Sequence, residues 1–269
     1  MTRGGRGRRP GERAPWQLGV PAALGASFLL LPLLALVVRA PWTSLGTHLT
    51  APPVRDALRL SLVCATSAAG LAILLGVPLA WVLARTVWRG AGLLRALVTV
   101  PLVLPPVVGG VALLKALGRG GIVGRWLDAA FGLTLPFTTA GVVVAETFVA
   151  MPFLVLAMEG AFRSVDTGLD EAATTLGASR WRSFTQVTLP SVVPGLVSGA
   201  VLAWARALGE FGATITFAGN SPGRTTTMPL AVYLAMERDP DAAVALSLVL
   251  LLVAVVILAT LRGSWLTTS

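Results

Sequence analysis

Side chains that bind metals or form cross-links are scarce in this sequence. Its 269 residues include one cysteine, Cys64, one histidine, His48, and one lysine, Lys115. A single cysteine excludes an intrachain disulfide, and the lack of a Cys/His cluster argues against a zinc site. Lys115 stands in LLKAL rather than in the Gly-Lys-Ser/Thr context of a phosphate-binding loop. The sequence therefore predicts that the chain has no ATPase of its own.

Charge is also scarce, and apolar residues take its place. Charged residues make up 12% of the chain and hydrophobic residues 55%, and the mean hydropathy is +0.80. Soluble domains carry about 25% charged residues, so the composition indicates a membrane protein. We expect an all-α fold, a polytopic bundle of six transmembrane helices with a helical cytoplasmic loop. The expected spans are 17–38, 58–84, 92–117, 136–158, 191–217 and 241–262.

The formal net charge of +9 comes almost entirely from arginine. These arginines are scattered among apolar spans, which favours contact with anionic headgroups over binding of nucleic acid. More of them fall in the segments that are cytoplasmic when the N-terminus is cytoplasmic, and this bias predicts that orientation. Residues 1–16 are rich in Arg, Gly and Pro and are predicted to be disordered. The run 17–38 is too long for a signal-peptide core and is predicted to be a retained first span of a transmembrane domain at 17–264.

Two spans carry small residues or breakers in unusual positions. In the third span, three prolines precede Gly109 and Gly110. Proline removes a backbone donor and kinks a helix, so this stretch is either a simple kink or a break that lines a pathway. In the fifth span, small residues recur every four positions at Ser191, Gly195, Gly199, Ala203 and Ala207. Such a face lets another helix approach closely, from the same chain or from a second copy.

The fifth span also holds two charges, Arg206 and Glu210, which are four residues apart on one helix face and can therefore neutralise each other. Gly209 and Gly212 flank Glu210 and Phe211 and predict a bend or gate. Glu146 in the fourth span and Arg206 both lie about 15 Å below the outer surface, which suggests that they pair. The charges are then either a structural clasp or a place where Arg206 guides a dianion. Thr214 and Thr216 offer hydroxyl donors nearby.

The loop 159–190 is the longest cytoplasmic segment. Glu159 and Arg163 are spaced to pair on a helix, Asp166 or Thr167 can cap a following helix, and Gly177 suits a left-handed helix end. The loop resembles the EAA loop of ABC importer permeases, whose pattern is EAA, three residues, Gly, nine residues, then Ile-x-Leu-Pro. Val187 replaces the isoleucine. The matching residues are Glu171, Ala172, Ala173, Gly177, Leu189 and Pro190.

The resemblance implies that this loop docks into a cytoplasmic ATPase. ATP and Mg would then bind to two partner ATPase subunits, and this chain would bind no cofactor and would not be an enzyme. It also implies a homodimer in the cytoplasmic membrane and an extracytoplasmic oxyanion-binding protein as partner. The outer loop 218–240 is the expected docking surface for that protein.

Within this family, the run ARALGEFGATITFAGN is similar to molybdate or tungstate permeases. Sulfate permeases tend to have tyrosine where this chain has Phe211. The implied function is import of molybdate or a similar tetrahedral oxyanion, with tungstate or sulfate/thiosulfate as alternatives. An ion-coupled secondary transporter that uses Glu146 and Glu210 as proton carriers is a further alternative, but it leaves the EAA loop unexplained. A membrane enzyme lacks a visible nucleophile–base or metal-ligand set.

Overall fold

The computed structural model describes residues 16–86 and 88–266, and all regular elements in these residues are helices. The prediction of an all-α fold is therefore confirmed. The predicted disordered tail 1–16 lies outside the described residues except for Trp16, where the first helix begins. The elements are α1 Trp16–Val38, α2 Leu45–Thr50, α3 Pro52–Arg85, α4 Ala91–Val103, α5 Pro106–Leu117, α6 Gly124–Phe131, α7 Thr139–Ser164, α8 Thr167–Thr175, α9 Arg180–Ser183, the π-helix η1 Phe184–Thr188, α10 Leu189–Ser191, α11 Val193–Leu208, α12 Gly212–Ala218, α13 Met228–Arg238 and α14 Pro240–Leu266.

Four helices are long and apolar enough to cross a membrane by themselves. They lie where four of the spans were expected, at Gln17–Val38, Pro52–Arg85, Thr139–Ser164 and Pro240–Ile257. Two bent pairs of helices bring the number of crossings to 6 if each pair is one span. The two remaining expected spans, 92–117 and 191–217, fall largely on these bent pairs.

The core of the bundle is built from α3, α7 and α11. On α3, the buried residues Ala65, Ala68 and Ala72 join the same apolar cluster as Leu154 and Val155 of α7. The small-residue face of α11 packs on α7 as well, because a Cβ added at Gly195 would lie 2.5 Å from the Cβ of Ala161. The helix that this face was predicted to meet is therefore in the same chain.

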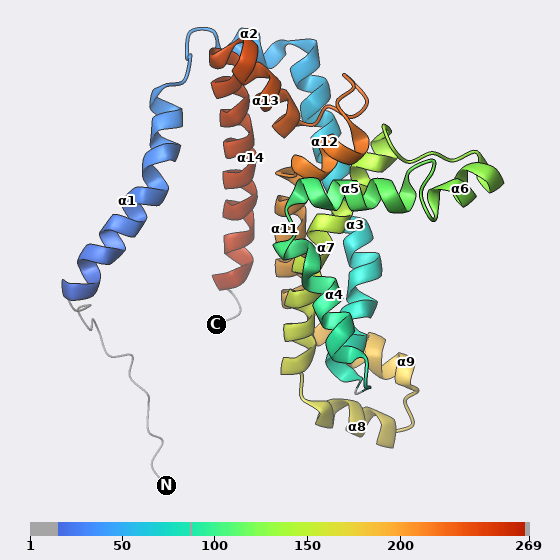
Figure 1. Cartoon of the computed structure of the whole chain (residues 1–269). Helices are drawn as coiled ribbons and strands as arrows, with labels where there is room; N and C mark the ends of the chain where they lie inside the picture. The colour runs from blue at the N-terminus through green and yellow to red at the C-terminus, as the bar shows by residue number, and fades with distance from the viewer. Residues whose placement is uncertain (1–15, 87, 267–269) are drawn as a thin grey trace.

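The third expected span is broken rather than simply kinked. The chain bends by 120° between α4 and α5. Figure 1 shows α5 lying across the bundle while α4 runs along it. Leu104 has ψ 130° and Pro105 has ψ 131°, both outside the helical range. Each precedes a proline, which disfavours the helical backbone. Of the two alternatives that the sequence left open for this stretch, a simple kink and a break, the structure therefore has the break.

The two ends of the bundle differ in what they carry. Figure 1 shows α2, α6 and α13 towards one end and α8 and α9 at the other. The end with α8 and α9 holds the loop 159–190, which the sequence assigns to the cytoplasm. At the opposite end, the N–H of Met228 donates to Oγ of Ser61 over 2.7 Å, so that α13 is tied to α3. α1 stands apart from the bundle, and none of its apolar window is buried.

Candidate functional site

The loop between α7 and α11 folds into two short helical segments joined by a sharp turn. Asp166 begins the first segment, since its Oδ1 accepts a hydrogen bond of 2.9 Å from the N–H of Gly168. Of the two predicted caps, Asp166 and Thr167, Asp166 is the residue that caps the helix. α8 ends before Gly177, which adopts φ +87°, so the predicted left-handed helix end is also confirmed. We call residues 166–191 the coupling loop, after the role that the resemblance to the EAA loop predicts for them.

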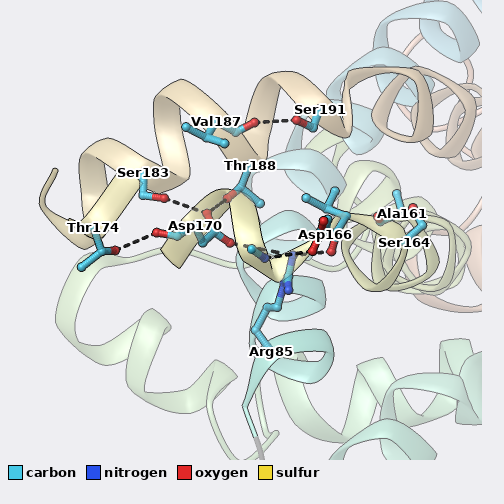
Figure 2. Close-up of polar contacts among 12 residues, drawn as sticks. Arg85, Ala161, Ser164, Asp166, Asp170, Thr174, Ser183, Val187, Thr188 and Ser191 are labelled. Atoms are coloured by element: carbon cyan, nitrogen blue, oxygen red, sulfur yellow. Dashed lines mark hydrogen bonds and ion pairs between the residues drawn. The ribbon is translucent and has the colours of Figure 1, made fainter. Parts of the chain in front are cut away.

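Asp170 is the internal anchor of the coupling loop. Its Oδ1 accepts hydrogen bonds from Oγ of Ser183 over 2.7 Å and from Oγ1 of Thr188 over 2.8 Å. Figure 2 shows both hydroxyl groups directed at the Asp170 carboxylate. Nη2 of Arg85, at the end of α3, lies 3.9 Å from Oδ2 of Asp170 and donates to the carbonyl of Val165 over 3.2 Å. These contacts fix α8 against η1 and against the end of a membrane-spanning helix.

The protonation of Asp170 reflects this environment. Partial burial raises the pKa of its carboxyl group, but the hydrogen bonds from Ser183 and Thr188 and the charge of Arg85 lower it more. The net pKa lies below the usual 3.8. The sequence pattern did not single out Asp170. The available signal was an aspartate directly before the EAA motif, with hydroxyl residues on the second half of the loop.

Two of the three residues of the EAA motif are exposed to solvent. Glu171 and Ala172 are exposed, whereas Ala173 is half-buried. The neighbouring Leu176 is 88% exposed and Trp181 is 73% exposed. A rigid loop with a carboxylate, a small residue and two large exposed apolar side chains is suited to contact another protein.

The second half of the loop is held to the bundle by aromatic side chains and by Leu189. The ring of Phe184 lies 6.0 Å from Trp81 on α3 and 6.3 Å from Phe162 on α7, centroid to centroid. Trp181 stacks on Phe184, with 5.8 Å between the ring centroids. Leu189 packs against the same core cluster, and Pro190, which is exposed, lies in the first turn of α10.

An ion network lies between the start of α4 and the end of α7. Oε1 of Glu159 is 2.7 Å from Nη2 of Arg95 and 2.7 Å from Nη2 of Arg163. The predicted pair of Glu159 and Arg163 is confirmed, and Arg95 is a third member that the sequence did not reveal. The Glu159 side chain is only 7% exposed, so its charge is compensated by two arginines from different helices.

The charges of the fifth span form a joint between α11 and α12. Nη1 of Arg206 lies 2.6 Å from Oε2 of Glu210, and Oε1 of Glu210 accepts a hydrogen bond of 2.7 Å from the N–H of Ala213. Glu210 thus binds the last turn of one helix and caps the first turn of the next. The helix is interrupted at residues 209–211, which confirms the predicted bend beside Gly209 and Gly212.

The helix after this joint is locked to α5. A Cβ added at Gly212 would lie 2.9 Å from Cβ of Pro106, and one added at Gly110 would lie 2.6 Å from Cβ of Thr216. The two helices that follow the two breaks therefore pack together as a pair. Phe211 faces a different element, since its ring lies 5.1 Å from that of Tyr233 on α13.

The predicted pair of Glu146 and Arg206 is wrong. In the described part of the chain, the ion pair of Arg206 is with Glu210, and Oε2 of Glu146 has no hydrogen-bond partner. Glu146 is 1% exposed. Thr214 is fully buried, and its hydroxyl has no described partner either. Equal depth along two helices does not fix the direction in which each side chain points.

Known proteins resemble this chain in sequence and in fold. Residues 72–266 match the family model "Binding-protein-dependent transport system inner membrane component". The molybdenum transport system permease protein ModB of Mycobacterium tuberculosis is 49% identical over 248 residues, 92% of this chain and 94% of the relative. ModB of Escherichia coli K12 is 42% identical over 80% of this chain and 93% of its own length.

More distant matches come from a sulfate system and from solved transporters. The sulfate transport system permease protein CysT of Escherichia coli K12 is 36% identical and covers 90% of this chain and 88% of its own length. A bacterial ABC transporter that imports alginate has a TM-score of 0.73 at 19% identity, with 93% of both chains covered. The methionine ABC transporter MetNI has a TM-score of 0.61 at 19% identity, with 82% of this chain and 100% of the other covered. These two structures share the fold.

Proposed function

The chain belongs to the family of binding-protein-dependent transport system inner membrane components, and from this premise we propose that it is the permease subunit of an ATP-driven molybdate importer. The coupling loop is the observation that carries the proposal of ATP-driven transport. Its Glu171 and Ala172 are exposed, while Asp170 and Phe184 hold the rest of the loop in place. Identity supports the substrate, because the relatives named for molybdenum are 49% and 42% identical and the one named for sulfate is 36% identical.

The partners follow from the two ends of the bundle. Two cytoplasmic ATPase subunits dock on the coupling loops of two copies of this chain, and ATP and Mg bind to those subunits. An extracytoplasmic oxyanion-binding protein docks on the outer loop 218–240. A related alginate ABC transporter has been solved in complex with its substrate-bound periplasmic protein, which supports docking of this kind.

Motion of the coupling loop reaches the bundle through defined contacts. The loop is tied to α3 through Arg85 and Trp81 and to α7 through Phe162. A rigid loop can therefore pass a displacement to both helices. We expect the joint at Glu210 to flex during alternating access, with α12 and α5 moving as the pair that their glycine contacts define.

Arg206 is the residue of the joint that can meet the substrate. Its side chain is 28% exposed, whereas that of Glu210 is 1% exposed. A dianion that reaches Arg206 competes with the Glu210 carboxylate for the guanidinium group. This competition keeps anion binding weak, as passage through a pathway requires. Thr214, Thr216 and Glu146 remain proposed members of the pathway wall.

The test is reconstitution of this chain with its ATPase and binding protein in liposomes. We expect uptake of labelled molybdate that requires ATP and is inhibited by vanadate. Glu171→Ala should lower uptake about tenfold, the factor that corresponds to a lost contact of about 1.4 kcal/mol. Asp56→Ala, which changes an exposed carboxylate at the other end of the bundle, is the matched control and should leave uptake unchanged. Uptake driven by a proton gradient alone would overturn the proposal.

Substrate choice is tested in the same liposomes by competition. Unlabelled tungstate should suppress molybdate uptake, and sulfate at equal concentration should not. Stronger suppression by sulfate would assign the chain to sulfate import and leave the ATP-driven mechanism intact.

A further inference from the structure

An apolar groove lies where the inner end of α3 meets the second half of the coupling loop. Its volume is about 390 Å³, and α3 contributes Val77, Pro78, Trp81 and Val82 to its wall. The coupling loop contributes Trp181, Phe184, Leu189 and Arg180, the one charged residue of the lining. Sites for small molecules fall in this size range and have this mainly apolar lining.

The groove continues the face of α3 that meets the membrane. Leu71, Leu74 and Leu75 are 36%, 66% and 55% exposed, and Pro78 and Val82 follow them at helical spacing. These positions therefore lie on one face of α3. An apolar face of a membrane-spanning helix is covered by acyl chains, and here the face runs directly into the groove. A chain that lies along α3 can enter the groove without leaving the apolar phase.

The positive charge of Arg180 in the groove lining favours lipids with an anionic headgroup. Arg180 lines the groove and is exposed, and no ion pair engages it among the described residues. The carboxylate of Asp170, in the same loop, is taken up by Ser183, Thr188 and Arg85. Trp81 and Trp181 flank the groove, and tryptophan is enriched at membrane–water interfaces. An arginine at this level attracts an anionic headgroup.

We propose that this groove binds an anionic phospholipid, with an acyl chain between α3 and the coupling loop and the headgroup at Arg180. The lipid contacts Trp181 and Phe184, the residues that hold the coupling loop to the bundle. Anionic lipid therefore stabilises the position of the loop relative to α3. Glu171, Ala172 and Leu176 do not line this groove, whereas Trp181 belongs both to it and to the exposed face. The site does not depend on which substrate is transported.

The test uses the full chain in nanodiscs that contain equal amounts of phosphatidylglycerol and phosphatidylcholine. Native mass spectrometry counts the lipids that the released protein retains. We expect selective retention of phosphatidylglycerol, reduced about fivefold by Arg180→Gln, the factor for about 1 kcal/mol per arginine near an anionic surface. Arg182→Gln, in the same short helix but outside the groove lining, is the matched control. Val82→Phe fills the groove, leaves Arg180 in place and should lower retention as well.

Each other outcome overturns the proposal. If Arg180→Gln and Arg182→Gln lower the retention of phosphatidylglycerol equally, the lipid is attracted by the cationic surface as a whole and not by Arg180. Equal retention of both lipids means that Arg180 does not select a headgroup, and unchanged retention in Val82→Phe means that the chain does not enter the groove. Weaker self-association of Val82→Phe without lipid retention in the parent chain assigns the groove to a second copy.

Discussion

Single carboxylates hold the functional parts of this molecule together. Asp170 binds two hydroxyl groups and faces Arg85, Glu159 binds two arginines, and Glu210 binds Arg206 and the N–H of Ala213. Asp170 and Glu210 join segments that lie on either side of a break in the helices, and Glu159 joins α7 to α4. Charge-assisted hydrogen bonds are about twice as strong as neutral ones, so one acidic side chain can replace the ladder bonds lost at a break.

Asp170→Ala tests this role in the coupling loop. The substitution leaves the hydroxyl groups of Ser183 and Thr188, which are 4% and 2% exposed, without their partner. A buried polar group that loses its partner costs about 1–3 kcal/mol. Amide exchange across residues 167–191 should therefore become roughly 30-fold faster, which corresponds to about 2 kcal/mol. Glu171→Ala removes the exposed neighbour and should leave amide exchange unchanged. Equal protection in both variants would contradict the role of Asp170.

The same residue predicts a pH dependence. The pKa of Asp170 is lower in the folded chain than its usual 3.8, so its contribution to stability is fully present above pH 3.8 and is lost as the pH falls through the lower, folded value. Loop protection should therefore hold from neutral pH down to this range and then decline. In Asp170→Ala this decline should be absent.

At the scale of helices, the close contacts of α11 with α7 depend on glycine. A Cβ at Gly195 would lie 2.5 Å from that of Ala161, and the next atom lies at 3.9 Å. Gly195→Ala should lower the unfolding free energy by about 1–3 kcal/mol through overpacking. Adding Ala161→Gly removes the clashing atom and should restore most of the loss. The thermal midpoint of unfolding in detergent measures the stability of the single and the double variant. Gly70→Ala is the control, because a Cβ at Gly70 has no atom within 4 Å. If the double variant is no more stable than Gly195→Ala alone, the loss of stability does not come from the contact with Ala161.

Local patterns predicted some elements and missed others for a physical reason. The helix end at Gly177, the cap at Asp166 and the small face of α11 depend on residues within one or two turns, and all three were predicted correctly. The size of the turn between α4 and α5, 120°, and the direction in which Glu146 points depend on how separate helices are oriented. The depth of Glu146 along its helix follows from residue counting, but its rotation about the helix axis does not. Arg95 and Asp170 were missed because their partners lie on segments brought together only by folding.

At the scale of the whole molecule, the positions of the charged loops predict one orientation in the membrane. The end that carries the coupling loop should face the cytoplasm and the end that carries loop 218–240 should face outside. The chain suits a cysteine test, because Cys64 is its only cysteine and is 0% exposed. Leu176→Cys and Ser221→Cys place one reactive thiol on an exposed residue at each end.

In intact cells, a membrane-impermeant maleimide should label Ser221→Cys and leave Leu176→Cys unlabelled. After permeabilisation, both variants should be labelled to a similar extent, because both sites are exposed. The parent chain, with only the buried Cys64, sets the background in both conditions. The opposite pattern in intact cells would invert the orientation and place the Glu171 face outside. The Glu171 face would then be out of reach of a cytoplasmic ATPase. The same labelling therefore also tests whether the coupling loop lies on the side of the membrane where ATP is hydrolysed.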